Sequence, residues 1–244
     1  MIDRRALFKL GLGALAHACS TSSTESTARL KARPWRTGNP ACPDRQDCLS
    51  PIDLGLKRPA LLYVPEKPSG AFALMLHGAN GRPDRLLSRI QPQADEFGVT
   101  LLAPKSEDLT WDAVYGSFGP DIAFIDDALR AAFAACAIDR KHLAVSGFSD
   151  GATYAIALGR ANGDLFTHVL AFSAGFILPV ETYGAPRVFL SHGTQDDIIP
   201  IDSGGRRIAR ELRRENLSVK FREFDGEHTL PPDVAREAFE WFKR

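Results

Sequence analysis

The chain has 244 residues, of which 44% are hydrophobic and 25% charged, a composition typical of a globular protein that buries one sizeable core. Its 30 Lys and Arg side chains balance 30 Asp and Glu side chains. This balance excludes a bulk electrostatic attraction to nucleic acid, and no basic segment with interleaved aromatic residues replaces it. We therefore expect no nucleic-acid partner.

The first 19 residues differ in character from the rest of the chain. An Arg4-Arg5 pair precedes a short apolar stretch over 6–16, and the letters AHA then provide a small-residue cleavage site. A charged start followed by an apolar stretch too short to span a membrane is typical of an export signal. The segment RRALFKLG is similar to a twin-arginine signal, and Cys19 lies where a bacterial lipoprotein would carry its lipid. Residues 1–19 therefore predict export to the periplasm or the outside of the cell, with Cys19 as the one candidate membrane anchor; the alternative is a cytoplasmic N-terminal helix.

Residues 20–50 are interpreted as a linker and a cysteine-containing N-terminal segment. Cys42 and Cys48 lie six positions apart in a loop rich in Pro and Asp, a spacing that suits a local disulfide in an exported protein. Cys136, in the segment AAFAACAID, is expected to be a buried thiol on a helix. Because no C-x₂-C pair is present, we expect no metal site.

From residue 51 on, short apolar strands alternate with helical patterns, and no internal repeat divides the chain. The predicted strands cover 60–66, 72–78, 99–104, 142–149, 168–175, 187–193 and 219–225. The predicted helices alternate with them and cover 84–98, 121–137, 150–163, 204–216 and 231–244, and a loop covers 105–120. Pro92 is expected to kink or interrupt the first helix, and Asp121 to cap the second. Apolar strands that alternate with helices indicate a parallel sheet covered on both faces. We therefore predict one α/β domain over 51–244, with a mostly parallel, twisted sheet.

The pattern G-x-S-x-G occurs once, as GFSDG over 147–151, between a predicted strand and a predicted helix. In this position the pattern is typical of a nucleophile elbow, a sharp turn that projects the hydroxyl of Ser149 above the sheet. Glycine on both sides would remove side chains that collide with the neighbouring strand and helix. The alternative is a glycine-rich turn in which Ser149 only caps the helix.

A serine hydroxyl becomes a good nucleophile only when a base takes its proton. His228 follows the last predicted strand and precedes the last helix, so a loop would hold its ring over the sheet edge. His77 and His192 end strands beside glycines and are expected to shape their loops. Asp196, favoured over its neighbour for its place in the loop, would orient the ring of His228.

Two backbone N–H groups are expected to bind the oxyanion of a reacting ester. One is the amide of Asp150, directly after the serine, and the other is that of Ala79 in the segment LMLHGANG, with Asn80 as second choice. Asn80 is also a candidate substrate contact. Trp111 and Phe118, in the loop TWDAVYGSF, are the other candidate contacts; packing in the core is the alternative for both aromatic residues.

The segments LMLHGANG, GFSDGATYA, SHGTQDDIIP and DGEHTLPPD together resemble bacterial α/β-hydrolases of the predicted esterase group. This is the phospholipase/carboxylesterase group, which adjoins enzymes similar to polyhydroxybutyrate depolymerases and dienelactone hydrolases. The resemblance extends from residue 58 to the C-terminus. It implies an α/β-hydrolase fold and an esterase without metal or organic cofactor. Carried onto this chain, it implies Ser149 as nucleophile, Asp196 as acid, His228 as base, and Ala79 and Asp150 as oxyanion donors.

Only the eleven residues of FILPVETYGAP separate the strands that end near 175 and begin at 187, which leaves no room for a large cap. We therefore predict an open site for small or surface-presented esters, including lipid and polymer esters. The leading hypothesis is a serine carboxylic-ester hydrolase. A serine peptidase similar to prolyl oligopeptidase and a non-catalytic binding protein of hydrolase fold stay open as alternatives. The sequence makes no prediction of oligomeric state.

Overall fold

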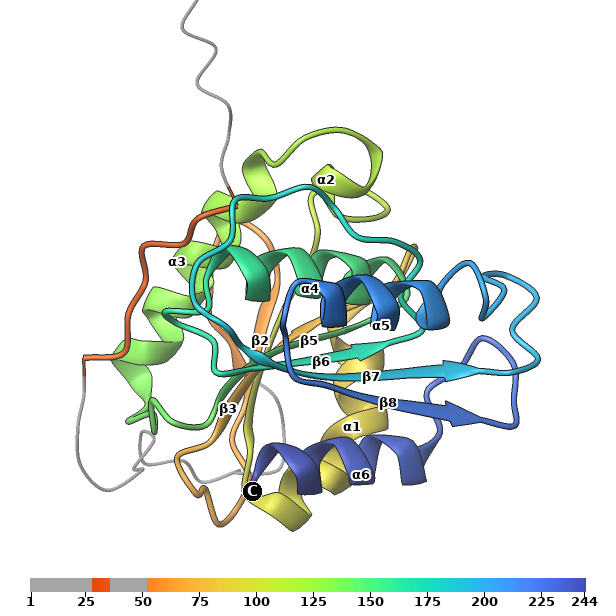
Figure 1. The fold of residues 1–244 in the computed structure, drawn as a ribbon. Helices are drawn as coiled ribbons and strands as arrows, with labels where there is room; N and C mark the ends of the chain where they lie inside the picture. Colours follow the sequence, from red (N-terminus) through yellow and green to blue (C-terminus); the bar gives the residue numbers. More distant parts are fainter. Residues whose placement is uncertain (1–27, 36–51) are drawn as a thin grey trace, which may run out of the picture.

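The computed structural model describes residues 28–35 and 52–244. The predicted export signal, its Cys19, and the proposed Cys42–Cys48 disulfide lie outside these residues. The described part of the chain forms one sheet with helices on both faces (Figure 1). Within these ranges, no helix has the length and apolar character needed to cross a lipid bilayer.

The sheet has eight strands in the order β1-β2-β4-β3-β5-β6-β7-β8. Their bounds are Ile52–Asp53 (β1), Ala60–Tyr63 (β2), Phe72–Leu76 (β3), Thr100–Pro104 (β4), Leu143–Phe148 (β5), His168–Phe172 (β6), Arg187–Gly193 (β7) and Val219–Phe224 (β8). Strand β2 is antiparallel to both of its neighbours, and every pairing from β4 to β8 is parallel. The carboxyl ends of β3, β5, β7 and β8 therefore meet at one edge, where parallel sheets collect functional groups.

The helices cover the sheet in two layers. Their bounds are Pro83–Phe97 (α1), Asp112–Tyr115 (α2), Pro120–Ala135 (α3), Asp150–Ala161 (α4), Gly205–Arg214 (α5) and Pro232–Phe242 (α6). Helices α3, α4 and α5 lie on one side of the sheet, and α1 and α6 lie on the other (Figure 1). The apolar side chains of α3, α4 and α5 belong to one core cluster, and those of α1 and α6 belong to the other. Strands β3, β4 and β6 are buried along their whole length, because both of their faces pack on helices.

Helix α1 is continuous through Pro92, so of the two expected effects, a kink or an interruption, the interruption is wrong. Proline removes one N–H and crowds the carbonyl of residue i−4, which here is Ser88. Both residues lie on the exposed face of the helix. The freed carbonyl therefore faces water, and the buried face formed by Leu87, Ile90 and Ala94 stays intact.

Residues 28–35, here called the N-terminal strap, lie in an extended conformation against the helical layer beside α3 and α4 (Figure 1). The buried amide of Asn162 accepts a hydrogen bond from Leu30 N at 2.8 Å and donates one to Ala28 O at 2.8 Å. The carboxylate of Asp126 accepts from the next two strap amides, both at 2.7 Å. Side chains of the domain thus satisfy the polar backbone of the strap.

Cys136, which directly follows α3, is disulfide-bonded and 2% exposed. The expectation of a free, buried thiol is therefore wrong. Its partner lies outside the described residues, since Cys136 is the single cysteine within 28–35 and 52–244.

The connection between β6 and β7 contains neither helix nor strand over 176–186. No large cap is inserted at this point of the described chain, as the sequence predicts. The carboxyl edge of the sheet is consequently open next to the last residues of β5 and β7.

Candidate functional site

Ser149 lies at the tight turn between β5 and α4, with φ of 56° and ψ of −121°. A non-glycine residue at positive φ is strained and is held there by its surroundings. Both flanking glycines are required by close packing. A Cβ at Gly147 would lie 2.2 Å from Gly151 O, and one at Gly151 would lie 2.2 Å from Leu76 O. The prediction that these glycines clear space for the turn is confirmed.

The structure brings Ser149, Asp196 and His228 together at the carboxyl edge of the sheet. His228 follows β8, and its Nε2 lies 2.9 Å from Ser149 Oγ. Its Nδ1 lies 2.7 Å from Oδ2 of Asp196, which follows β7. The carboxylate accepts from Nδ1–H, so Nε2 of the neutral ring is free to accept the serine proton.

Three hydrogen bonds fix the carboxylate of Asp196. Its Oδ1 accepts from the backbone N–H of Ile198 at 3.1 Å and of Ile199 at 2.8 Å. Its Oδ2 accepts from His228 and also lies 3.1 Å from Nε2 of His192. Because two of the three donors are backbone N–H groups of the same loop, the carboxylate is held in one orientation towards His228.

His192 is fully buried at the end of β7, and its Nε2–H donates to Ile199 O at 2.8 Å. The same nitrogen lies 3.1 Å from Oδ2 of Asp196. The ring packs closely on two glycines, since a Cβ at Gly204 or Gly205 would lie 2.8 Å from a ring or Cβ carbon of His192. From the sequence, His192 is expected only to shape its loop, and no sequence pattern indicates its contact with Asp196.

The two predicted oxyanion donors lie beside the serine. Among the described residues, neither the Ala79 amide nor the Asp150 amide donates a hydrogen bond to a protein acceptor. Asp150 is the first residue of α4, where amides have no partner within the helix. Ala79 belongs to the turn after β3, and a Cβ at the preceding Gly78 would lie 3.2 Å from Ser149 Cβ. Both amides are therefore available to an incoming oxygen.

The turn that carries Ala79 is closed by the hydrogen bond from Gly81 N to Gly78 O at 2.9 Å. Asn80 has φ of 53°, a conformation that asparagine tolerates better than most residues, and its amide donates to Leu109 O at 2.7 Å. The backbone of Asn80 is thus used to hold the turn, and its side chain lines the cleft described below.

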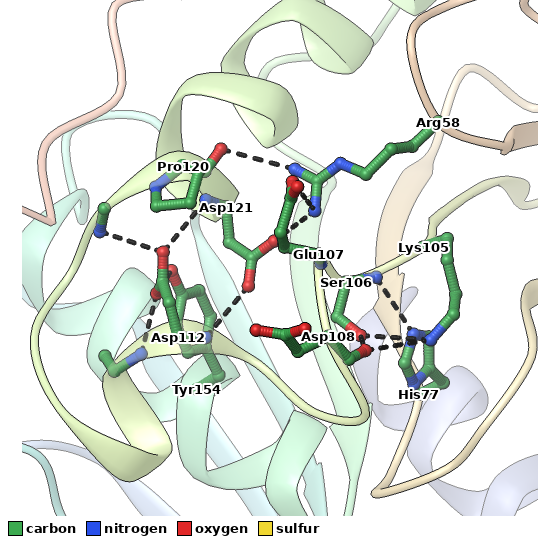
Figure 2. Close-up of polar contacts among 12 residues, drawn as sticks. Arg58, His77, Lys105, Ser106, Glu107, Asp108, Asp112, Pro120, Asp121 and Tyr154 are labelled. Atoms are coloured by element: carbon green, nitrogen blue, oxygen red, sulfur yellow. Dashed lines mark hydrogen bonds and ion pairs between the residues drawn. The ribbon is translucent and has the colours of Figure 1, made fainter.

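His77 connects the same turn to Ser106, and Figure 2 shows its contact with Ser106. Its Nδ1–H donates to Gly78 O at 2.8 Å, and its Nε2 accepts from the amide of Ser106 at 3.1 Å. This pattern requires the neutral ring, and burial lowers the pKa of His77 to about 4. The indole N–H of Trp111 donates to His77 O at 2.8 Å. His77 therefore ties the turn after β3 to the loop after β4.

Trp111 and Phe118 are not in the wall of the cleft, contrary to expectation. Trp111 is fully buried, Phe118 is 9% exposed, and neither lines the cleft beside Ser149. Their rings instead pack on Tyr154 of α4, each with centroids 5.4 Å apart. Because the loop is short and its polar groups are bonded inward, both rings point into the core, where burial of large apolar surface stabilises the fold.

Two carboxylates, the buried Asp121 and the partly buried Asp112, organise the loop after β4, as Figure 2 shows. Asp121 accepts from the amides of Glu107 and Asp112 at 2.8 and 2.9 Å and from Arg58 at 2.6 Å. Asp112 in turn accepts the Tyr154 hydroxyl at 2.9 Å, and burial next to this carboxylate raises the pKa of Tyr154. The expectation that Asp121 caps α3 is wrong: the helix begins at Pro120, and Asp121 holds the loop.

A cleft of about 380 Å³ opens over Ser149 and His228. Besides these two residues, its lining consists of His77, Gly78, Ala79, Asn80, Gly81, Arg82, Arg85, Leu86, Arg89, Phe148 and Ile198. The sequence argument found Ala79 and Asn80 but missed the arginines of α1. Their signal is visible in the letters RPDRLLSR, where three arginines follow the predicted oxyanion turn within eight residues.

Comparison with known proteins was made for both sequence and structure. The model of the phospholipase/carboxylesterase family matches residues 117–242, just over half of the chain. A probable feruloyl esterase C of Aspergillus niger is 28% identical over 139 residues, which are 53% of this chain and 50% of the relative. Its counterpart in Aspergillus flavus is 30% identical over 117 residues, 48% of this chain and 42% of the relative. The chain thus spans about half the length of the curated relatives it matches.

Solved structures share the arrangement of strands and helices. A phospholipase/carboxylesterase of Dyadobacter fermentans has a TM-score of 0.60 at 22% identity and covers 77% of this chain and 97% of its own. The carboxylesterase of Bacillus cereus has a TM-score of 0.59 at 18% identity, with 77% and 94% covered. Identities this low show the fold alone. The predicted α/β-hydrolase fold, with a mostly parallel sheet and no large cap, is confirmed.

Proposed function

The chain belongs to the phospholipase/carboxylesterase family, and on that premise we propose that it is a serine carboxylic-ester hydrolase that works through an acyl-enzyme. The observation that carries this proposal is the continuous relay from Ser149 Oγ through His228 to Asp196, with contacts of 2.9 and 2.7 Å. Both distances lie within hydrogen-bond reach, which is the first requirement for a general base.

In the proposed acylation step, Ser149 Oγ bonds to the carbonyl carbon of the ester while His228 Nε2 takes its proton. The electron pair of the carbonyl moves to its oxygen, which the amides of Ala79 and Asp150 bind. Collapse of this intermediate breaks the bond to the alcohol, and the alcohol receives the proton from His228. Asp196 stabilises the imidazolium in between without being protonated.

In the proposed deacylation step, water takes the place of the alcohol. His228 removes a proton from the water, the resulting hydroxide attacks the acyl carbon, and Ser149 Oγ leaves with the proton that His228 returns. The products are the free acid and the starting enzyme. The connection over 176–186, which contains no cap in the described chain, supports small or surface-presented esters as substrates.

Hydrolysis of 4-nitrophenyl acetate, 4-nitrophenyl butyrate and methyl ferulate tests this function. Methyl ferulate is included because two relatives are named probable feruloyl esterases. Ser149→Ala should lower kcat by about three orders of magnitude or more and abolish labelling by a fluorophosphonate. Ser117→Ala, at an exposed position of the loop after β4, is the matched control and should behave as the wild type.

Equal ester turnover by the wild type and Ser149→Ala would refute the proposal. Turnover of the matching 4-nitroanilides at rates near those of the esters would replace it by the peptidase alternative. Absence of both turnover and fluorophosphonate labelling in the folded wild type would favour a binding protein of hydrolase fold.

We also propose that residues 1–19 direct export of the chain. The disulfide of Cys136 supports this, because disulfides persist mainly in oxidising compartments. Fractionation of cells that express the whole chain tests the proposal: recovery only in the cytoplasmic fraction at full length would contradict it.

A further inference from the structure

The cleft over Ser149 is charged on one side. Three arginines, Arg82, Arg85 and Arg89, belong to its lining, and the lining contains no Asp or Glu. The whole chain carries equal numbers of cationic and anionic side chains, so this local excess is not a consequence of composition. The opposite part of the lining is apolar and includes Phe148 and Ile198, of which Ile198 is 68% exposed.

Arg85 and Arg89 make no ion pair with any residue in the described part of the chain. They lie one helical turn apart on the exposed side of α1, a spacing at which like charges repel each other weakly. Arg82 differs, because it forms a bidentate pair with Asp84 at 3.0 and 2.9 Å. The guanidinium groups of Arg85 and Arg89 are therefore free to bind an external anion.

Other surface arginines of the same domain do contact carboxylates. Arg236 of α6 contacts the carboxylate of Glu96, and Arg206 of α5 contacts that of Glu223. Arg210 and Arg214 of α5 repeat the unpaired, one-turn spacing of Arg85 and Arg89, but they do not line the cleft. Both pairs lack an ion-pair partner among the described residues, but only Arg85 and Arg89 lie in the cleft beside Ser149.

We propose that the ester substrates of this protein carry an anionic group, a carboxylate or a phosphate, which Arg85 and Arg89 bind while the carbonyl carbon lies at Ser149. The inference rests on the proposed esterase function and narrows its substrate class. Planar guanidinium groups match the oxygens of both anions and bind them through charge-assisted hydrogen bonds. The apolar side formed by Phe148 and Ile198 would contact the carbon chain between ester and anion.

Two matched substrate pairs test the inference and distinguish the source of the anion. In the first, the mono-4-nitrophenyl ester of glutaric acid is compared with 4-nitrophenyl 5-methylhexanoate, which has the same shape without the charge. In the second, a 1-butyryl ester of glycerol 3-phosphate is compared with 1-butyrylglycerol. The kcat/KM ratio of the anionic to the neutral member is measured for each pair.

The wild type should favour the anionic member in at least one pair, and 0.5 M salt should reduce that ratio because it screens exposed charges. Arg85→Gln/Arg89→Gln should lower the ratio about tenfold or more, mainly through KM of the anionic ester. Arg210→Gln/Arg214→Gln removes the same charge at the same spacing away from the cleft and should keep the wild-type ratio.

Hydrolysis of both members at equal kcat/KM by the wild type would overturn the inference and leave the esterase function standing. Equal losses for both members in Arg85→Gln/Arg89→Gln would also overturn it. Failure to hydrolyse any ester, without fluorophosphonate labelling, would remove the esterase function and the inference together.

Discussion

Gly147 and Gly151 lie two residues on either side of Ser149 and pack directly against backbone atoms. A Cβ at either position would lie 2.2 Å from a carbonyl oxygen, which is far inside van der Waals contact. The atoms in the way belong to the backbone of α4 and β3 and not to the end of a flexible side chain. The site therefore depends on the absence of a side chain at Gly147 and Gly151 as much as on the reactive side chains.

Gly151→Ala should destabilise the fold by several kcal/mol, because strand β3 and helix α4 must separate to admit the methyl group. Ser117→Ala is the control, because it removes only a hydroxyl group at an exposed position. Urea unfolding should therefore give a wild-type midpoint for Ser117→Ala. Similar midpoints for the two variants would contradict this account.

His192 is a positioning residue for Asp196, and its removal should act on turnover more than on binding. His192→Leu deletes the donor to Ile199 O and the ring nitrogen that lies 3.1 Å from Asp196 Oδ2, and it should lower kcat about tenfold with little change in KM. His192→Gln places an N–H at a similar reach and should restore part of kcat. A loss of kcat that is the same in both variants would assign His192 a packing role only.

The reactive residues were readable in the sequence, whereas their supports were not. Ser149 is found by a motif, and His228 and Asp196 follow from chain order and loop position. His192 was missed because a buried histidine at a strand end has no local pattern that separates a hydrogen-bond donor from a core residue. Trp111 and Phe118 were misplaced because residue type alone does not tell which way a loop turns its aromatic rings.

Among the elements, the N-terminal strap is held by side chains that are distant in sequence. Asn162 accepts a hydrogen bond from Leu30 N and donates one to Ala28 O, and Asp126 accepts from two strap amides. These bonds replace those that a strand partner would provide. No periodic pattern marks residues 28–35, so the sequence argument included them in a linker. Strand β7, in contrast, was predicted at its observed bounds, because an apolar run between turn signals is a local property.

Asn162→Ala should destabilise the domain by about 2 kcal/mol, because it leaves buried backbone groups of the strap without partners. Amide exchange at Leu30 should become faster in the same variant. Asp164→Asn breaks ion pairs to Arg29 and Arg33 that are partly exposed, and it should cost less than about 1 kcal/mol. A larger loss for Asp164→Asn than for Asn162→Ala, measured by urea unfolding, would reverse this order.

For the molecule as a whole, two buried histidines make the stability depend on pH. Burial lowers the pKa of both His77 and His168 to about 4, whereas an unfolded histidine titrates near pH 6.5. Between these values the unfolded chain binds more protons than the folded one. The free energy of unfolding is therefore highest above pH 6.5 and falls as the pH drops towards 4.

Each of these histidines should lower the free energy of unfolding by up to about 3 kcal/mol as the pH falls from 6.5 to 4. Urea unfolding at pH 7, 6 and 5 should show a steadily falling free energy of unfolding. His168→Gln, remote from the cleft at the opposite end of β6, should reduce the slope by about half. A free energy that does not change between pH 7 and pH 5 would contradict the burial of two neutral rings.

The backbone at Ser149 has a thermodynamic consequence for the entire fold. A serine at φ of 56° costs about 1–3 kcal/mol, against a total stability of about 5–15 kcal/mol for a typical domain. Glycine would adopt this conformation freely, yet it has no hydroxyl to react. The packing of the remaining chain must therefore offset the strain at Ser149. The protein keeps its reactive hydroxyl at the cost of a lower free energy of unfolding.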